Sequence, residues 1–471
     1  MTKSYDVAII GAGTAGLSAL AVVRKQTQSF VLVNDGAYGT TCARVGCMPS
    51  KALIEVAKAL HRREYLREMG IAGGEALRAD LPEVLRHVRR VRDSLVQGVL
   101  KLTAGLGERN LAGRARLAGP GAIEVAGERI VAARIIIATG SRPVVPAPWR
   151  ALGKRVLTTD DLFEQVDLPR RIAVVGLGAV GTEMAQALAR LGLEVSGFDA
   201  AERIAGLADA KVNAAALELL RREFPIRLGA PVELAAEGEG VRISAAGEQF
   251  VADKVLVALG RAPNLDGLGL ETLGVELDQR GLPPFDPRTM QIADLPVFLA
   301  GDANAHAPVL HEAADEGWIA GHNALRDAPA CFERRLHLGI VFTDPNLATV
   351  GARIEQLDDK ATVVGEAGLS GQGRLRMSGE DHGLMRVYAD KASGRLLGAA
   401  LCAPGAEHLA HLLALAIQQR LTVREMLRLP FYHPVVEEAL RSALRDVARQ
   451  TEQAPEPDLA ACERLNAEAL D

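Results

Sequence analysis

The sequence predicts an α/β fold with two Rossmann-like dinucleotide-binding domains and a C-terminal α+β domain. An apolar strand, a glycine-rich turn and a helix occur in that order twice, with the turns at residues 11–16 and 176–181. From about Leu336 the pattern changes to strands and helices of an α+β kind. The 471 residues are enough for roughly three or four domains.

The first glycine-rich turn has the spacing G-x-G-x-x-G and follows the apolar strand Tyr5–Ile10. A helical stretch continues to about Lys25, and a second strand, Phe30–Val33, ends at Asn34 and Asp35. Glycines at this spacing allow a tight turn and let a pyrophosphate approach the backbone at the helix N-terminus. The glycines of this first fingerprint are Gly11, Gly13 and Gly16.

The second copy begins with the strand Arg171–Val175 and has its helix up to about Leu191. The next strand is Glu194–Phe198, followed by Asp199. One such turn alone is a weak signal, because many ordinary strand-to-helix turns contain glycine. Two complete copies imply that two dinucleotides bind side by side. The glycines of this second fingerprint are Gly176, Gly178 and Gly181.

Three further apolar strands end in turns that we expect at the nucleotide-binding sites. Ile135–Pro143 breaks at Thr139 and Gly140, and Val255–Asn264 repeats the pattern with Gly260. The strand at 297–302 ends with Asp302. Ligands of open α/β sheets bind at the carboxyl ends of the strands, so we expect these turns near the ligands.

Cys42 and Cys47 form the most unusual local pattern in the chain, which has five cysteines. In a regular helix, residues five apart have Cα atoms roughly 8–9 Å apart, whereas a disulfide needs about 4.4–6.8 Å. A bond between them therefore requires a distorted turn, which Gly46 permits, before a helix that has Pro49 near its start. A thiolate at that helix N-terminus would have a lowered pKa.

Composition excludes several classes of function. The net charge is −5 and aromatic residues make up 4% of the chain, so nothing suggests nucleic-acid binding. No stretch reads as a signal peptide or membrane span, so the default location is the cytoplasm, where a redox cysteine pair fits better than structural disulfides. One helix is expected to have an apolar face formed by Val84, Val88, Val91, Leu95 and Val99. Its other side has Arg86, Arg89 and Arg90, either as a solvated face or as a docking patch for an acidic carrier protein.

A histidine with nearby acids stands close to the C-terminus. His433 is followed by Pro434, and Glu437 and Glu438 come shortly after. Histidine exchanges protons near neutral pH, and a carboxylate on one ring nitrogen makes the other a better base. From these residues alone either glutamate could serve, and an exposed histidine without a catalytic role is the commoner case.

These motifs together resemble the flavoprotein disulfide reductases, the family that contains dihydrolipoyl dehydrogenase, glutathione reductase and mercuric reductase. The resemblance covers about residues 5–448 and implies a homodimer that binds FAD and NAD and no metal. It implies FAD contacts from Gly11, Gly13, Gly16, Asn34, Thr41, Lys51, Thr139, Gly140 and Asp302. It implies NAD contacts from Gly176, Gly178, Gly181, Glu183, Asp199 and Gly260. The expected division is an FAD domain (1–147), an NAD domain (148–266), a segment returning to the FAD domain (267–335), a dimerisation domain (336–450) and a flexible tail (451–471).

The resemblance also implies roles in catalysis. Cys47 would lie near the flavin as the charge-transfer thiolate, and Cys42 would exchange with the disulfide substrate. His433, from the other subunit, would carry protons, with Glu438 as its orienting acid. Lys51 and Glu183 match a pair beside the flavin that helps to close the nicotinamide site.

This chain departs from the family pattern at several places. Asn34 stands where an acid usually binds the adenosine ribose of FAD, and the cysteine pair is surrounded by Thr40, Ala43 and Arg44. Arg44 could lower a thiolate pKa or meet an anionic substrate. Asp199 is followed by two alanines, Ala200 and Ala201, where NADP-dependent relatives tend to have arginine, so NAD(H) is expected.

The expected activity is transfer of electrons from a protein-bound dihydrolipoyl group to NAD+, with a lipoylated carrier protein as partner. The alternatives are reduction of another small disulfide or oxidant, a redox sensor without turnover, and a flavin-bound structural subunit. Mercuric reductases have a second cysteine pair near the C-terminus, whereas this chain has only Cys462 there, taken as an incidental residue or a single resolving thiol.

Overall fold

The computed structural model describes residues 3–453 and 457–459, and the chain divides into two compact units. The first unit comprises residues 1–53, 80–168 and 257–334, and the second comprises residues 54–79, 169–256 and 335–471. Cys462 and most of the expected flexible tail lie outside the described residues. No helix within the described ranges is long and apolar enough to cross a membrane.

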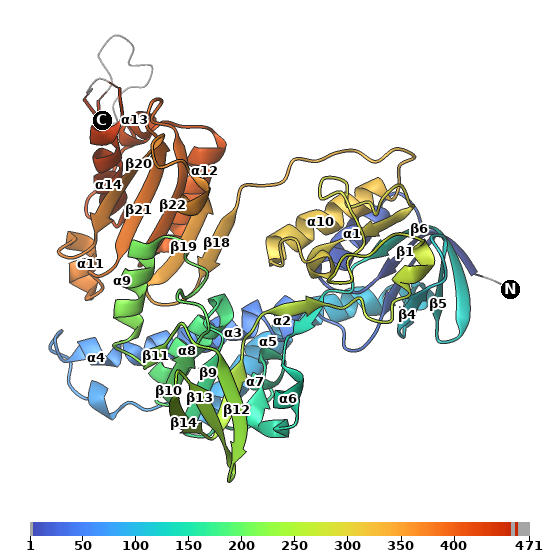
Figure 1. Ribbon diagram of the computed structural model, residues 1–471, viewed down its shortest axis with the longest axis horizontal. Coiled ribbons are helices and arrows are strands. Elements are labelled where there is room, and N and C mark those ends of the chain that lie inside the picture. Colours follow the sequence, from blue (N-terminus) through green and yellow to red (C-terminus); the bar gives the residue numbers. More distant parts are fainter. Residues whose placement is uncertain (1–2, 454–456, 460–471) are drawn as a thin grey trace. The chain divides into compact units, whose positions relative to one another are not determined.

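The first unit is built on a seven-stranded sheet with the order β3-β2-β1-β6-β5-β4, in which β17 also pairs with β6 (Figure 1). The central strands β1, β2, β6 and β17 run parallel. Its strands are β1 (Lys3–Ile10), β2 (Phe30–Asn34), β3 (Asn110–Ala112), β4 (Ala115–Leu117), β5 (Ala122–Val125), β6 (Glu128–Ile137) and β17 (Val297–Leu299).

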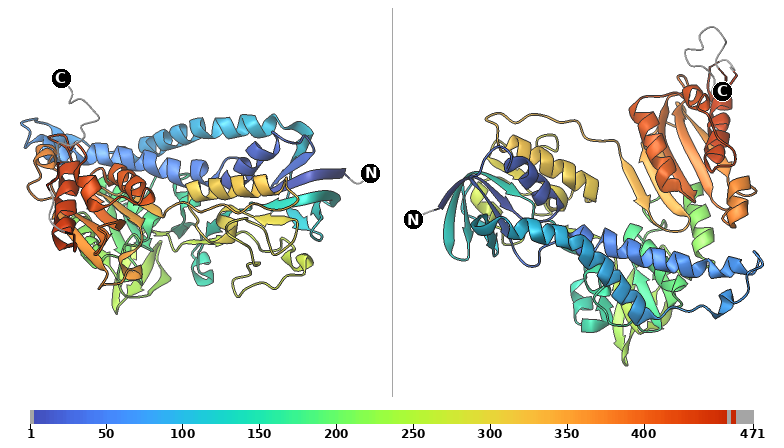
Figure 2. Two further views of the ribbon diagram at one scale, coloured as in Figure 1. Left: turned by 90° about the horizontal axis from the view of Figure 1, so that it is seen from above. Right: turned by 180° about the vertical axis from the view of Figure 1, so that it is seen from behind.

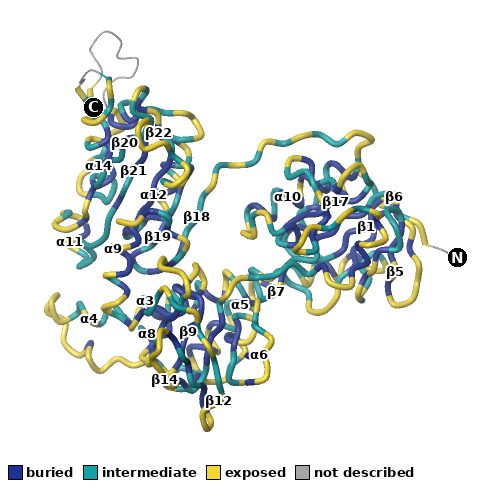
Figure 3. The backbone as a smooth tube through the Cα atoms, in the orientation of Figure 1, coloured by how far each residue is buried: buried dark blue, intermediate teal, exposed yellow. Residues whose placement is uncertain are grey.

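Alternate residues of β1 enter two separate apolar clusters, one on each face of this sheet. Val7 and Ile9 pack with α1 and α10, and Ala8 and Ile10 pack into the opposite cluster. The central strands β1, β2, β6 and β17 form the buried centre of the first unit in Figure 3. The helices of this part are α1 (Thr14–Val23), α2 (Thr41–Arg44), α3 (Cys47–His61, which continues into the second unit), α5 (Leu81–Ala104), α6 (Ala147–Arg150), α7 (Thr159–Leu162) and α10 (Leu310–Asn323).

Helices α1 and α10 pack very closely because α10 presents glycines to the backbone of α1. A Cβ on Gly317 would lie 2.0 Å from the Ala15 carbonyl oxygen, and one on Gly321 would lie 2.9 Å from the Ala19 Cα. Neither position has room for a side chain. The helix that follows the first fingerprint is therefore held by direct backbone contact.

The two apolar segments that end in similar turns meet as a short antiparallel ribbon. β7 (Ser141–Pro143) pairs with β16 (Arg261–Pro263), with Ala262 opposite Arg142. The backbone N–H of Asn264 also donates to the Gly140 carbonyl. This ribbon returns the chain to the first unit, where β17 then joins the main sheet.

Helix α5 has its apolar side buried through Val84, Val88 and Val96, whereas Leu95 is exposed. The arginine side of this helix is only partly free. Arg89 donates to the carbonyl oxygens of Phe163 and Gln165 at 3.1 and 2.6 Å, so its guanidinium fixes the end of α7. A docking patch on this helix would thus lack one of the three arginines considered for it.

The second unit contains the strands β11, β10, β9 and β15, in that order in one sheet, and a three-stranded antiparallel sheet, β12-β13-β14. Strands β9, β10 and β11 run parallel. Its strands here are β9 (Arg171–Val175), β10 (Glu194–Phe198), β11 (Ile226–Arg227), β12 (Val232–Glu237), β13 (Gly240–Ala245), β14 (Glu248–Ala252) and β15 (Lys254–Val257). Its helices are α4 (Arg63–Leu66), α8 (Ala179–Arg190) and α9 (Ala210–Leu220).

The C-terminal part of the second unit is an antiparallel sheet with the order β18-β19-β22-β21-β20. Helices α12 and α14 pack against it over a cluster of buried leucines, valines and alanines (Figure 2). Its strands are β18 (Leu338–Val341), β19 (Asn346–Gly351), β20 (Thr362–Gly368), β21 (Leu384–Asp390) and β22 (Leu396–Ala403). Its helices are α11 (Gly373–Ser378), α12 (Ala406–Gln418), α13 (Val423–Leu427) and α14 (Glu437–Gln450). The α/β fold class with an α+β C-terminal domain is confirmed.

Candidate active site

The first fingerprint is a strained turn that only glycine can form. Gly11 has φ +110°, and a Cβ there would lie 2.2 Å from the Ala138 carbonyl oxygen. A Cβ on Gly16 would lie 1.9 Å from the Gly11 carbonyl oxygen. Around Gly13, in contrast, no atom lies within 4 Å of a built Cβ. The space over Gly13, at the N-terminus of α1, is where an approaching pyrophosphate would fit.

A cavity of about 440 Å³ opens at the carboxyl ends of β1 and β2. Asn34 lines it, and the Asn34 Oδ1 accepts a hydrogen bond from the Ala12 N–H at 3.0 Å. Thr139 also lines the cavity, and its buried Oγ1 has no hydrogen-bond partner among the described residues. A buried hydroxyl without a partner on a polar cavity wall fits a site for a polar ligand. The cavity therefore suits the adenosine half of FAD.

Asp302 is held by contacts that link distant segments of the first unit. The Ser141 hydroxyl donates to the Asp302 carboxylate at 2.7 Å, and the Arg261 Nε donates to the Ser141 Oγ at 2.8 Å. Asp302 thus has a fixed orientation in the turn that follows β17. The contacts of Ser141 and Arg261 could not be predicted locally, because their partners are more than a hundred residues away.

A buried carboxylate also stabilises the turn that contains Asp302. Glu316 is 0% exposed and accepts hydrogen bonds from the Gly301 N–H and the Asn304 amide, each at 2.7 Å. Arg334 donates to Glu316 at 2.9 Å. Burial raises the pKa of Glu316, although Arg334 and the hydrogen bonds oppose that rise. Sequence reasoning missed Glu316, which an acidic residue within an otherwise buried helix face could have signalled.

Cys42 and Cys47 lie on opposite sides of a distorted turn. Cys42 is in the four-residue helix α2, and Cys47 is the first residue of α3. Thr40 begins α2 by accepting the Ala43 N–H at 3.0 Å. A Cβ on Gly46 would lie 3.0 Å from the Thr41 carbonyl oxygen and 3.2 Å from the Cys42 Cα. The close approach at Gly46 is what brings the two cysteines together.

The two cysteines interact directly as thiols. The hydrogen bond with Cys47, followed by burial, raises the pKa of the Cys42 thiol well above its ordinary value. The positive charge of Lys51 opposes this effect. Cys42 is half-buried and Cys47 is exposed.

Arg44 lies near a carboxylate of the same unit. Burial raises the pKa of Asp160, while Arg261 and Arg44 both act to lower it. A Cβ on Gly39 would lie 2.9 Å from the Arg44 side chain, which therefore folds back over the loop before α2. Lys51 is thus the cation that acts on Cys42, and Arg44 contributes to the charge around Asp160.

His433 and Glu438 form a close pair in the second unit. The His433 Nδ1 lies 3.0 Å from the Glu438 Oε1, and the Val435 N–H donates to the Glu438 Oε2 at 3.2 Å. The His433 hydrogen bond, followed by that from Val435, lowers the pKa of Glu438. The His433 side chain is 78% exposed, so its other ring nitrogen is accessible. Glu438, rather than its neighbour Glu437, is the acid that orients this histidine.

The second fingerprint has the same arrangement as the first, with a carboxylate in place of the amide. The Leu177 N–H donates to the Asp199 Oδ2 at 2.5 Å, and the Ala201 N–H donates to the Asp199 Oδ1 at 2.8 Å. Gly178 has open space around a built Cβ, as Gly13 has. The turn therefore has room for a second pyrophosphate at the N-terminus of α8.

Glu183 is buried one turn into α8 and accepts the Phe342 N–H at 2.9 Å. Lys51 belongs to the first unit and Glu183 to the second, so their pairing remains a prediction. The same holds for a meeting of His433 with the cysteines. Among the described residues, no group of three or more His, Cys, Asp and Glu side chains could hold a metal ion.

Similarity to known proteins covers nearly the whole chain. Residues 5–317 match the family model described as pyridine nucleotide-disulphide oxidoreductase, and residues 338–444 match the dimerisation domain of the same family. The second match supports a homodimer. The family uses FAD and NAD(H), which agrees with the two fingerprints and the room above them.

Curated proteins similar to this chain are named for two different activities. Dihydrolipoyl dehydrogenase 3 of Pseudomonas aeruginosa is 33% identical over 473 residues, covering 95% of this chain and 98% of that protein. Dihydrolipoyl dehydrogenase of Thermus scotoductus is 33% identical over 464 residues, with the same coverage of 95% and 98%. Mercuric reductase of Streptomyces lividans is 32% identical over 472 residues, covering 94% and 97%.

Solved structures show the same fold. The HOCl-induced flavoprotein disulfide reductase RclA of Escherichia coli has a TM-score of 0.82 at 23% identity, covering 94% of this chain and 99% of that one. LpdA of Mycobacterium tuberculosis is 24% identical and covers the same shares. The fingerprints, the cysteine pair and the two family matches lead to one conclusion: this chain belongs to the pyridine nucleotide-disulphide oxidoreductase family.

Proposed function

We propose that this oxidoreductase transfers electrons from a dihydrolipoyl dithiol to NAD+ through the Cys42–Cys47 pair. The observation that carries this proposal is the direct contact of the two cysteines across the Gly46 turn. The named relatives at 33% identity are dihydrolipoyl dehydrogenases, which supports this choice of substrate. A lipoylated carrier protein is the partner that this substrate implies.

The proposal assigns each predicted residue a place. The first fingerprint, Asn34, Thr41, Lys51, Thr139, Gly140 and Asp302 would hold FAD. The second fingerprint, Glu183, Asp199 and Gly260 would hold NAD. When bound, FAD supplies the exchange of an electron pair between thiols and a nicotinamide, which no side chain performs.

The cysteines carry out thiol–disulfide exchange. A substrate thiolate attacks the Cys42 sulfur, the Cys42–Cys47 bond breaks, and Cys47 leaves as a thiolate. The second substrate thiol then attacks its own mixed-disulfide sulfur, which releases the oxidised substrate and the Cys42 thiolate. That thiolate takes up one proton, and the other proton passes to His433, which Glu438 orients. The substrate dithiol is oxidised by two electrons and the cysteine pair is reduced by two.

The raised pKa of Cys42 explains why such a site needs a base. A thiol that keeps its proton is a poor nucleophile. In the reverse direction, Cys42 must lose that proton before it attacks a disulfide substrate. His433 of the partner subunit would accept it, because its second ring nitrogen is exposed.

A second candidate is reduction of another small disulfide or oxidant. The mercuric reductase among the relatives favours it, as do Thr40, Ala43 and Arg44 around the cysteines. Arg44 adds positive charge at the end of α2, which suits an anionic substrate.

The test is a steady-state assay of the holoenzyme with NAD+ and free or carrier-bound dihydrolipoyl groups, and with NADH and glutathione disulfide or small oxidants. The dihydrolipoyl groups should give the highest kcat/KM, and Cys42→Ser should abolish that turnover. Cys331→Ser, at an exposed cysteine outside the pair, is the matched control. Turnover of dihydrolipoamide by Cys42→Ser would contradict the proposal. Reduction by NADH without turnover of any disulfide would indicate a redox sensor.

A further inference from the structure

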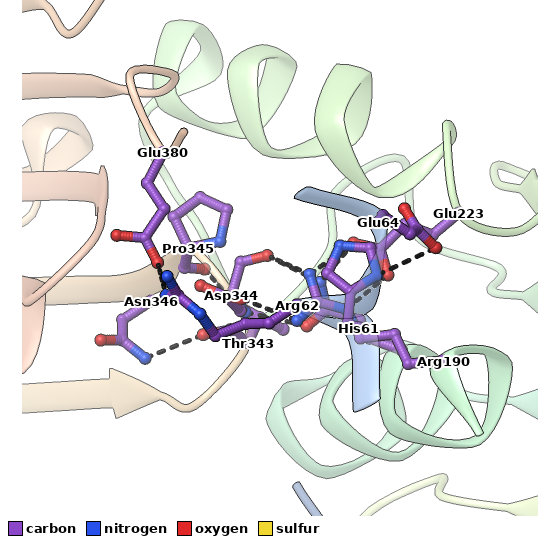
Figure 4. A network of polar contacts seen from close by, with 11 residues as sticks. His61, Arg62, Glu64, Arg190, Glu223, Thr343, Asp344, Pro345, Asn346 and Glu380 are labelled. Carbon is purple, nitrogen blue, oxygen red and sulfur yellow. Dashed lines mark hydrogen bonds and ion pairs between the residues drawn. The ribbon is translucent and has the colours of Figure 1, made fainter. Parts of the chain in front are cut away.

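A dense polar network joins helix α8 to the turn between β18 and β19 (residues 342–345, here the β18–β19 turn). Figure 4 shows its centre, where Arg190 lies between Asp344 and Glu223. All of these residues belong to the second unit. Arg190, Asp344 and Glu223 were not expected from the sequence, because these partners are far apart in the chain.

The network is organised by side chains on one face of α8. Glu183, Gln186 and Arg190 are spaced by three and four residues, so they project from the same side of the helix. Glu183 accepts the Phe342 N–H at 2.9 Å, and the Gln186 Oε1 accepts the Asp344 N–H at 2.8 Å. The β18–β19 turn is thus bound along α8 at alternate residues of its backbone.

Gln186 and Arg190 bind Asp344 at several atoms. The Gln186 Nε2 donates to the Asp344 carbonyl at 2.7 Å. The Arg190 Nη1 donates to the Asp344 Oδ2 at 2.7 Å, and its Nε donates to the Glu223 Oε2 at 2.6 Å. Burial favours the neutral form of Asp344, but Arg190, with smaller effects from Lys58 and His61, lowers its pKa overall. Gln186 and Arg190 therefore hold Asp344 by charged and neutral hydrogen bonds, and these three residues are here called the clamp. The Arg190 side chain is only 7% exposed.

The N-terminus of the same helix faces the second fingerprint. Gly178 precedes α8, and Glu183 is one turn into it, between the dinucleotide turn and the clamp. The dinucleotide turn has its own support from Asp199, which does not involve the clamp. The two ends of α8 are thus held by separate contacts.

We propose that Gln186 and Arg190 are positioning residues for the nicotinamide half of NAD(H): they hold the β18–β19 turn on α8 and thereby fix Glu183 beside the nicotinamide. The inference rests on the proposed assignment of the second fingerprint and of Glu183 to NAD(H), and it holds for any disulfide substrate. The adenosine and pyrophosphate half depends on Gly176–Gly181 and Asp199 instead. Loss of the clamp therefore weakens binding of the nicotinamide selectively.

The test uses the holoenzyme with Arg190→Met, Gln186→Leu and the conservative Arg190→Lys. Titration calorimetry measures the Kd of NAD+ and of ADP-ribose, which lacks the nicotinamide. Loss of one or two hydrogen bonds should raise the Kd of NAD+ and the KM of NADH about tenfold, with the ADP-ribose Kd changing less than about twofold. Arg190→Lys should recover part of the loss. Arg222→Met, which removes an exposed ion pair with Glu218, is the control and should change neither Kd.

Equal weakening of NAD+ and ADP-ribose, or no change in either, would overturn the inference. Gln186→Leu removes no charge, so it keeps the test valid if Arg190→Met fails to fold. The KM of NADH is measured with ferricyanide as acceptor, which does not need the cysteines. Failure of the proposed dihydrolipoyl activity is thereby separate from failure of this inference.

Discussion

The two fingerprints of this chain are copies of one motif that are stabilised by opposite kinds of contact. In the first, Asn34 accepts the Ala12 N–H, and α1 is held by the glycines of α10. In the second, the Asp199 carboxylate accepts the Leu177 N–H, and α8 is held by charged and amide side chains. Close contact with glycine holds the helix after the first fingerprint, and a polar clamp holds the far end of the helix after the second.

The glycine motif itself specifies only the turn between strand and helix. Gly11 and Gly176 both have positive φ, and both turns leave open space over their second glycine. What differs is the tertiary contact behind each helix. Packing by glycine does not depend on pH or salt, whereas a buried ion pair depends on the ionisation of its carboxylate.

The largest expected effect comes from filling the contact between α1 and α10. Gly317→Ala places a Cβ 2.0 Å from the Ala15 carbonyl oxygen, so the helices must separate. We expect a loss of about 3 kcal/mol or more in stability and release of FAD at a lower temperature. Flavin fluorescence during heating measures this release.

Gly98→Ala is the matched control for that substitution. Gly98 lies within α5, and no atom is within 4 Å of a built Cβ. The change should leave flavin release unaltered or stabilise the helix by up to about 1 kcal/mol. Similar damage from both variants would show that the close packing is not what holds the first site.

The next largest effect is a dependence of stability on pH, which we expect from the Asp344 carboxylate of the clamp. The folded pKa of Asp344 is lowered, so its contribution to stability is complete above its unfolded pKa of about 3.9 and is lost as pH falls through the folded value. Breaking this buried pair with Asp344→Asn should cost about 3 kcal/mol at pH 7. The difference in Tm between wild type and variant should shrink towards low pH.

The control for pH is Asp253→Asn, which removes an ion pair with Arg171 near the surface. Its Tm difference should be small at neutral pH, since exposed pairs contribute about 0–1 kcal/mol. A Tm difference for Asp344→Asn that stays constant down to low pH would contradict a charged clamp.

A smaller effect is expected at the dinucleotide itself. If Asp199 binds the ribose as proposed, Asp199→Asn removes the charge that would repel a 2′-phosphate and weakens the hydrogen bond to the ribose. The preference for NADH over NADPH, measured as a ratio of kcat/KM, should fall at least about tenfold. A clear preference of the wild type for NADPH would reverse the assignment made from Asp199, Ala200 and Ala201.

The smallest effect is the reciprocal change in the first fingerprint. Asn34→Asp would give FAD a charge-assisted hydrogen bond like that proposed for Asp199. We expect FAD affinity of the apoprotein to rise about threefold, an effect that the adjacent Asp35 limits by repulsion. Fluorescence titration of apoprotein with FAD measures it. Weaker FAD binding by Asn34→Asp would show that the amide, not its lack of charge, is what this site requires.

The sequence predicted those features that are encoded locally. The strands Arg171–Val175 and Glu194–Phe198 have the predicted bounds, because apolar strands next to glycine turns are strong local signals. Cys47 does begin a helix. Leu95 was wrongly expected on the apolar face of α5, since an ideal helical spacing does not describe how that long helix meets its neighbours.

The contacts that hold the sites together could not be predicted in this way. Arg190 and Asp344 are 154 residues apart, and Ser141 and Asp302 are 161 apart. Nothing in the local sequence distinguishes Arg190, Asp344 or Ser141 from surface residues, whereas Asp302 was expected from the apolar strand before it. From local residues alone Glu437 and Glu438 were equal candidates. The family resemblance favoured Glu438, and the fold around Val435 shows Glu438 at the histidine.

The division of labour between Cys42 and Cys47 is the central claim. It is tested most directly by treating the NADH-reduced holoenzyme with one equivalent of iodoacetamide and mapping the labelled peptide. Cys42 should carry the label, because in the proposed arrangement the bound FAD covers Cys47 and His433 removes the proton of Cys42. Label on Cys47, which is the more exposed of the two in this structure, would contradict the claim and exchange the two roles.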